Sequence, residues 1–134
     1  MKEERLDPET LMEAAREASE RAYAPYSNFH VGAAVLTGGG NIYQGSNIEN
    51  ASYGLSICAE RNAATTMAFA DPEDRVIEVV AVYSPNTSPC FPCGACRQFL
   101  REFGCKEVVV DDGSRLRRYP FQEILPNSFG PEDL

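Results

Sequence analysis

Apolar residues recur at helical intervals near the N-terminus of the chain and form short unbroken runs farther along. Residues 7–23 carry alanines and larger apolar side chains on one face, and Pro8 suits a first helical turn, so this segment predicts a helix. The run at 29–36 indicates a buried strand, and the glycine-rich turn at 38–41 leads into a second run at 42–46. The first half therefore predicts a helix followed by an antiparallel hairpin.

Helical and strand patterns alternate in the second half of the chain. The β-branched run VIEVVAVY is too short and too apolar for an exposed helix and is typical of a central strand. In chain order we predict a helix at 56–70, this strand at 76–83, a helix at 94–103, a strand at 107–110 and a short helix at 120–125. The alternation favours an α/β fold of three layers, α-β-α, with a mixed sheet that begins with the antiparallel hairpin and continues with parallel strands.

Length and charge narrow the class of protein. With 134 residues and 43% hydrophobic content, the chain has the size and core of a single domain, which we expect to span residues 1–134. It carries 12 Lys and Arg against 20 Asp and Glu, a net charge of -8, which disfavours binding to a nucleic-acid polymer. It shows neither a signal-type apolar segment nor a membrane-spanning run, so we expect a cytoplasmic protein with no membrane partner.

The five cysteines are the main chemical signal in the sequence. Without a secretion signal, an odd number of cysteines is more typical of thiols or metal ligands than of disulfides. Cys58 lies near the start of one predicted helix and Cys93 and Cys96 at the start of another, where a helix N-terminus lowers thiol pKa. Zinc held by three thiolates keeps a fourth position open, as catalytic zinc sites do, and Glu60 could lean over that position without binding the metal.

Spacing alone leaves other interpretations of these cysteines open. The three thiols could form a buried set or a purely structural zinc site. Cys90 and Cys93 also form a C-x-x-C pair that could be redox-active or supply the ligands, although the proline before Cys93 and the Gly-Ala after it favour the pair with Cys96. Cys90 is then a spare loop thiol and Cys105 a small buried residue near a helix end, and we expect neither to matter for catalysis.

Two short motifs resemble the signature of zinc-dependent nucleobase and nucleoside deaminases, namely Cys58-Ala59-Glu60 and Pro92-Cys93-Gly94-Ala95-Cys96. The likeness covers nearly the whole chain, which is similar to the small homotetrameric cytidine deaminases. It rests on the segments 23–27, 29–34, 47–51, 58–61, 93–98 and 125–134. The resemblance implies a cytidine deaminase-like fold and one Zn²⁺ per chain.

The resemblance also implies a reaction. Free cytidine and 2′-deoxycytidine would be hydrolysed to uridine and 2′-deoxyuridine plus ammonia, as in pyrimidine salvage. Cys58, Cys93 and Cys96 would hold the zinc, and zinc-bound hydroxide would attack C4 of the base. Glu60 would take the proton of the water, pass it to N3 and then help to protonate the departing amine.

The substrate contacts are likewise those that the resemblance implies. Asn47 and Glu49 would bind the ribose, and Phe29 would pack on the pyrimidine ring. The backbone at Ala59 would help to read the base edge. Phe129, in the C-terminal tail, would reach the pocket of a neighbouring subunit, which would make the protein a homotetramer.

Charge balance draws attention to the residues around the ligands. Three thiolates give the zinc site a net negative charge, which opposes ionisation of a bound water. Arg61 directly follows Glu60 and could donate hydrogen bonds to the ligand sulfurs, as the resemblance suggests, and Arg97 is a weaker candidate for this role. His30 is the single histidine, and three cysteines leave it no necessary role as a ligand.

Other functions remain open at this point. One is deamination of a modified cytosine nucleoside, such as an aminonucleoside antibiotic, although Asn47 with Glu49 argues for a plain ribose. Another is editing of cytosine within a polynucleotide, which the acidic charge disfavours. A third is a non-catalytic binding module that zinc stabilises, and such a module would have no need of Glu60.

The C-terminal part of the chain carries two further expectations. Residues 104–119 are fewer than the resemblance implies between the last two strands, so we expect the final strand to be shortened or missing. The tail at 126–134 has too few apolar residues to hold itself in place, so only docking would order it.

Overall fold

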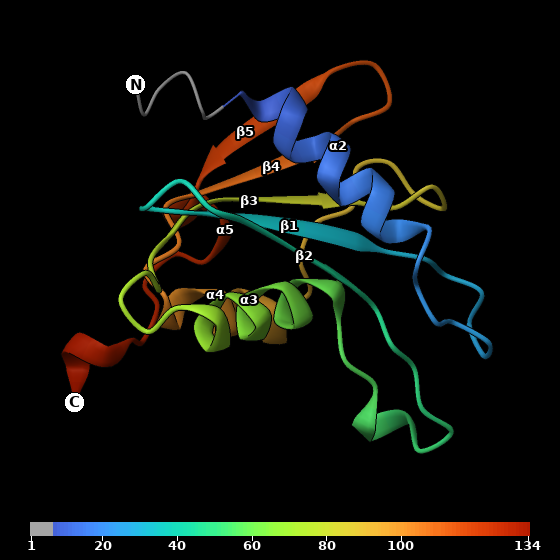
Figure 1. Ribbon diagram of the computed structural model, residues 1–134, viewed down its shortest axis with the longest axis horizontal. Coiled ribbons are helices and arrows are strands. Elements are labelled where there is room, and N and C mark those ends of the chain that lie inside the picture. The colour runs from blue at the N-terminus through green and yellow to red at the C-terminus, as the bar shows by residue number, and fades with distance from the viewer. Residues whose placement is uncertain (1–6) are drawn as a thin grey trace.

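The computed structural model describes residues 7–134, whose strands form one five-stranded sheet in the order β2-β1-β3-β4-β5 (Figure 1). In chain order the elements are α2 Pro8–Ser19, β1 Gly32–Thr37, β2 Ile42–Ser46, the 3-10 turn η1 Tyr53–Leu55, α3 Ala59–Ala70, β3 Ile77–Tyr83, α4 Gly94–Glu102, β4 Glu107–Asp111, β5 Leu116–Pro120, α5 Phe121–Ile124 and the 3-10 turn η2 Pro131–Asp133. Within residues 7–134 no helix has the length and apolar character needed to cross a membrane.

The sheet is mixed, as the sequence predicts. β1 pairs antiparallel with β2 and β3, and β3 pairs parallel with β4. The final strand is not missing, because β5 is a five-residue strand antiparallel to β4, and whether it is shortened relative to the family stays a prediction. A tight turn between β4 and β5 leaves enough residues to form this strand. In the turn, Asp112 Oδ1 accepts hydrogen bonds of 2.9 Å from the backbone N–H groups of Ser114 and Arg115.

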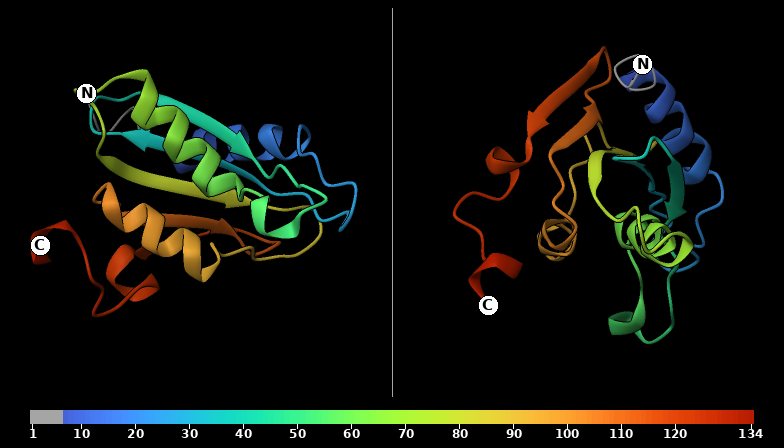
Figure 2. Two further views of the ribbon diagram at one scale, coloured as in Figure 1. Left: turned by 90° about the horizontal axis from the view of Figure 1, so that it is seen from below. Right: turned by 60° about the vertical axis from the view of Figure 1, so that its left-hand side comes forward.

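Helices cover both faces of the sheet. α2 lies on one face, and α3 and α4 lie side by side on the other (Figure 2), which confirms the predicted three-layer arrangement. In β3, Val80 and Val82 pack toward α3 and α4, whereas Val79 and Ala81 pack toward α2. Burial of both faces explains why this strand is an almost unbroken apolar run.

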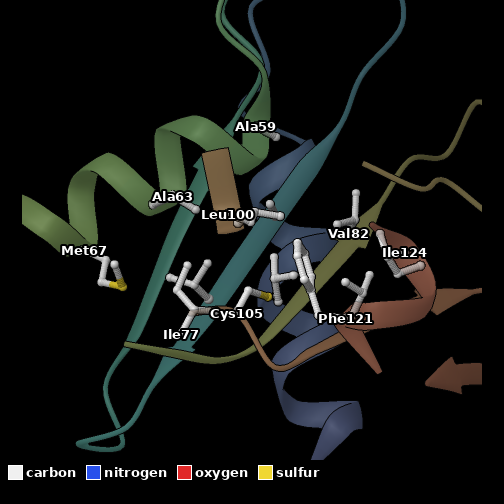
Figure 3. Close-up of a cluster of buried hydrophobic side chains, with 14 of the residues drawn as sticks. Ala59, Ala63, Met67, Ile77, Val82, Leu100, Cys105, Phe121 and Ile124 are labelled. Atoms are coloured by element: carbon white, nitrogen blue, oxygen red, sulfur yellow. The ribbon is translucent and has the colours of Figure 1, made fainter. Parts of the chain in front are cut away.

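The larger of the two apolar clusters fills the space between the sheet and the helices α3 and α4. Figure 3 shows this cluster, in which Ala63 and Met67 from α3 and Leu100 from α4 point toward residues of the sheet. Cys105, which is 6% exposed, belongs to the same cluster and is the small buried residue that the sequence predicts. The two helices whose starts carry the cysteines are therefore anchored on the core.

A glycine in β2 lets α3 approach the sheet closely. A Cβ atom on Gly45 would overlap the backbone nitrogen of Ala63 and lie 2.6 Å from the carbonyl oxygen of Ala59. No side chain fits there without displacing the helix backbone. Gly45 therefore sets how closely the first turns of α3 pack on β2.

α3 begins at Ala59, three residues after the start of the predicted helix, because the residues before it pair with an earlier segment. Ile48 and Ile57 exchange two backbone hydrogen bonds of 2.9 Å, and Ile48 also forms a bridge with Tyr23. Ile57 is thus held in a β-bridge and Cys58 becomes the N-cap of α3. The same pairing brings residues 47–49 beside the start of the helix.

Candidate metal centre and active-site cleft

Three cysteines converge where α3 and α4 begin. Cys58 is the N-cap of α3, Cys93 is the N-cap of α4, and Cys96 lies in the first turn of α4. Their Sγ atoms lie within 4.8 Å of one another, and the Sγ atoms of Cys58 and Cys93 are 3.8 Å apart. Tetrahedral zinc with Zn–S bonds of about 2.3 Å separates its sulfur ligands by about 3.8 Å. The three sulfurs therefore fit a zinc ion in spacing and in chemistry.

The surroundings of the thiols favour charge on Cys58. Hydrogen bonds from Cys96, and then from Cys93 and Arg61, lower the pKa of the Cys58 thiol to about 5 although its burial opposes this. Cys96 gives a hydrogen bond to Cys58, and this bond, together with burial, raises the pKa of Cys96. The cluster thus stabilises a thiolate, which is the form of cysteine that binds metal.

Arg61 lies against this cluster, as the sequence predicts for a charge-balancing residue. Burial opposes the charge on its guanidinium, but the hydrogen bond to Cys58 and the charges of the three thiols raise the pKa of Arg61. Its Nη2 donates to the carbonyl oxygen of Ser56 at 3.4 Å, and its Nε is buried with no hydrogen-bond partner among residues 7–134. A cation beside the thiols suits an anionic metal site.

Arg97 has a different role from the one considered for it. Its Nε donates to the carbonyl oxygen of Pro92 at 2.8 Å, and its Nη1 donates to the carbonyl oxygen of Ile124 at 2.7 Å. These two bonds tie the loop before Cys93 to the end of α5. Arg97 therefore braces the segment that carries a ligand.

Glu60 is a buried carboxyl beside the thiols. It is the second residue of α3 and is 4% exposed. Burial, and to a smaller extent the charge of Cys58, raises the pKa of Glu60 to about 7, while hydrogen bonding from its own backbone opposes the rise. A carboxyl in such a position can both accept and donate a proton near neutral pH.

Cys58, Glu60 and Cys93 line an open cleft of about 400 Å³. It brings together seven of the residues that the sequence singles out, which are Phe29, Asn47, Glu49, Cys58, Ala59, Glu60 and Cys93. Cys96 and Arg61 are not among its lining residues, and Cys96 is fully buried behind it. Segments far apart in the sequence therefore form one site.

Side chain to backbone hydrogen bonds organise the polar part of the cleft. Glu49 Oε1 accepts hydrogen bonds from the backbone N–H groups of Tyr26 at 2.9 Å and Ser27 at 3.2 Å, and the Ser27 hydroxyl donates to Oε2. The hydroxyl bond, followed by the backbone bonds, lowers the pKa of Glu49. Asn47 Oδ1 accepts from Val31 N–H at 2.9 Å and its Nδ2 donates to the Phe29 carbonyl at 2.8 Å.

Phe129 lies elsewhere in this chain. Its side chain is 57% exposed on the tail beside α4, and it is not among the residues that line the cleft. The tail is docked on α4, as expected for a segment that cannot order itself, since Gln98 Nε2 donates to the Phe129 carbonyl at 2.9 Å. The role of Phe129 in a neighbouring pocket stays a prediction.

Sequence reasoning missed a loop that lines the cleft. Thr87, Pro89, Cys90 and Phe91 all line it. Burial, and then the charge of Glu60, raises the pKa of Cys90 to about 11, so this thiol stays protonated. Cys90 lies outside the cluster of three sulfurs. Its position three residues before Cys93 was the signal that could have placed this loop at the site.

Comparison with known proteins agrees with the site. A family model described as the cytidine and deoxycytidylate deaminase zinc-binding region matches residues 6–111. A cytidine deaminase of Halalkalibacterium halodurans is 40% identical over 132 residues, which cover 96% of this chain and 98% of that protein.

Solved structures give the same result for the fold. A crystal structure of cytidine deaminase from Burkholderia pseudomallei is 43% identical with a TM-score of 0.83, and the match covers 92% of this chain and 100% of that one. The structure of cytidine deaminase from Mycobacterium tuberculosis is 36% identical with a TM-score of 0.79, over 93% and 98% of the two chains. The chain therefore belongs to the cytidine deaminase family of zinc-binding hydrolytic enzymes.

Proposed function

We propose that this chain, as one domain spanning residues 1–134, converts free cytidine and 2′-deoxycytidine with water into uridine and 2′-deoxyuridine plus ammonia, in cytoplasmic pyrimidine salvage. The observation that carries the proposal is the burial of the Glu60 carboxyl in a cleft that it shares with Cys58 and Cys93. A structural zinc site has no need of a buried carboxyl beside its ligands, whereas hydrolysis of an amine needs a group that moves protons.

Cys58, Cys93 and Cys96 would hold Zn²⁺, which lowers the pKa of a water toward neutrality when it is bound in such a site. Glu60 takes a proton from the attacking water and passes it to N3, which makes C4 electrophilic. It then takes the second proton and gives it to the amine at C4. The new C–O bond replaces the C–N bond, so one water enters and one ammonia leaves.

Other groups that line the cleft hold the nucleoside. Asn47 and Glu49 bind the ribose, Phe29 packs on the pyrimidine, and the backbone at Ala59 reads the base edge. Support comes from their shared cleft and from the lowered pKa of Glu49, since an ionised carboxylate accepts hydrogen bonds from sugar hydroxyls strongly. None of these groups requires a 2′-hydroxyl, so both nucleosides are substrates.

Phe129 completes the cleft of a neighbouring subunit in a homotetramer. Its 57% exposed side chain supports this, and so do Tyr53 at 74% and Leu55 at 65%, which leave apolar area on the segment next to the cleft. Sedimentation should give a tetramer, and an active monomer would contradict this part of the proposal.

The activity is tested by ultraviolet absorbance during incubation with cytidine, 2′-deoxycytidine and free cytosine, next to an assay of bound zinc. We expect both nucleosides to be converted, the free base to be left intact, and about one zinc to be bound per chain. Bound zinc without conversion of any of the three would contradict the proposal and would favour a modified nucleoside or a binding role.

A further inference from the structure

The C-terminal tail is held on α4 by two polar side chains of one helix face. Gln98 and Arg101 are three residues apart on α4 and therefore lie on the same side of the helix. Gln98 binds the carbonyl of Phe129, and Arg101 Nε donates to the hydroxyl of Ser128 at 2.7 Å. Arg101 Nη2 also forms an ion pair with Glu132, so Arg101 binds the tail on both sides of Phe129.

The tail backbone lies directly on the guanidinium. A Cβ atom on Gly130 would overlap Cζ of Arg101 and lie 2.6 Å from its Nη2. A side chain at residue 130 would therefore have to displace the guanidinium of Arg101. The Arg101 side chain is 20% exposed, which fits a group with protein on several sides.

Phe129 lies between these contacts, but its ring takes little part in the packing. Phe129 stays 57% exposed, although its carbonyl and both neighbouring residues contact α4. Burial of this ring therefore contributes little to the stability of the chain itself. The contacts instead fix the backbone from which the ring projects, and a group fixed in this way loses less conformational entropy when it docks.

We propose that Arg101 is a positioning residue, which presents Phe129 to the substrate cleft of a neighbouring subunit. This inference rests on the proposed function, in which Phe129 completes that cleft. Arg101 lines no part of the cleft of its own chain and acts through the tail. Its loss should weaken substrate binding and leave the zinc site unaltered.

A double-mutant cycle tests the inference in the zinc-loaded chain of residues 1–134. Arg101→Gln should raise KM for cytidine roughly threefold to tenfold, with zinc content unchanged, because the tail must then be ordered on binding. In a Phe129→Ala background the same substitution should change KM less than about twofold. Equal effects in the two backgrounds would overturn the inference, and so would an unchanged KM in Arg101→Gln alone.

Two further variants separate positioning from general stability. Gly130→Ala should displace the guanidinium and reproduce the KM of Arg101→Gln, which keeps the test available if Arg101→Gln folds poorly. Arg101→Lys should recover only part of the effect, because an ammonium cannot bind Ser128 and Glu132 in the fork geometry of a guanidinium. Arg115→Gln, at an exposed arginine of the β4–β5 turn, is the matched control.

Hydrogen exchange gives a readout that does not depend on activity. The peptide 126–134 should exchange faster in Arg101→Gln than in the parent protein, while peptides of β3 should not change. Unchanged exchange in the tail would overturn the inference about Arg101. A parental KM in Phe129→Ala, by contrast, would contradict the proposed role of Phe129 and overturn the inference with it.

Discussion

The two ends of the cleft are built in different ways. The thiol end is lined by Cys58, Cys93 and Glu60, with the buried Cys96 completing the thiol cluster, and the loop end is lined by Phe29, Asn47 and Glu49. The thiol end is formed by the starts of two helices that pack on the core, whereas the loop end is held by hydrogen bonds from side chains to the backbone. Substitutions at the thiol end should therefore lower zinc content, kcat or both. Substitutions at the loop end should raise KM and leave zinc content unchanged.

The largest effect is expected from removal of a ligand at the thiol end. Cys96→Ala should reduce bound zinc to near zero and lower activity by more than about a thousandfold, because two thiolates do not hold a catalytic zinc. Metal analysis and the nucleoside assay measure both. Cys90→Ala is the matched control and should keep full zinc, since Cys90 lies outside the cluster of sulfurs. Loss of zinc from Cys90→Ala but not from Cys96→Ala would contradict this assignment. It would show that Cys90 and Cys93 are the ligand pair instead of Cys93 and Cys96.

A smaller effect at the same end is expected from Arg61→Ala. Loss of the guanidinium beside the thiols should weaken zinc affinity by about 10- to 100-fold without unfolding the chain. Competition with a chelator measures the affinity, and Arg115→Ala serves as an exposed control. Zinc affinity equal to that of the parent would show that the helix N-termini alone balance the charge of the ligands.

At the loop end, Asn47→Ala should raise KM with zinc content unchanged. The substitution removes the hydrogen bonds to Val31 N–H and to the Phe29 carbonyl, so the wall of the cleft loses two bonds of about 0.5–1.5 kcal/mol each. We expect KM for cytidine to rise roughly tenfold. Asn41→Ala, in the distant β1–β2 turn, should leave KM at the parental value. Loss of zinc from Asn47→Ala would contradict the claim that the loop end affects KM without affecting the zinc site.

The smallest effect concerns pH. The pKa of Glu49 lies below the ordinary carboxyl value, so its ionised form and hydrogen bonds are present above that value and are lost only as the pH falls through the lowered pKa. Glu49 should therefore cause no change in KM for cytidine between about pH 8 and pH 5.5, and the titration of Glu60 near pH 7 should appear in kcat. Kinetics over this range, with zinc content checked at each pH, measure it. A KM that rises steadily across the range would contradict an ionised, prepositioned Glu49.

The thiol end was easier to predict from the sequence than the loop end, and the reason is physical. Cys58, Glu60 and Cys93 lie in short motifs at helix starts, where local sequence sets the geometry. The loop end depends on pairing between residues distant in the chain, such as Glu49 with Tyr26 and Ser27. No periodicity reports such contacts, so Asn47 and Glu49 were indicated by the family resemblance alone.

The fold shows the same division. The almost unbroken apolar run of β3 predicted a central strand covered on both faces, because a strand buried on both faces is composed mainly of apolar residues. The start of α3 was placed three residues early, since the bridge between Ile48 and Ile57 overrides the local helical pattern. The possibility that the final strand is missing was wrong, because the carboxylate of Asp112 holds a tight turn that leaves residues 116–120 free to form β5.

The most direct test of this account is the turnover of Glu60→Gln compared with that of the parent protein, at equal zinc content. The amide keeps the shape of the buried side chain but cannot take a proton from water, so kcat should fall by about 10²- to 10⁴-fold while bound zinc stays at about one per chain. Glu73→Gln, an exposed glutamate, should match the parent. Parental turnover in zinc-loaded Glu60→Gln would contradict the central claim that this carboxyl moves the protons of the reaction.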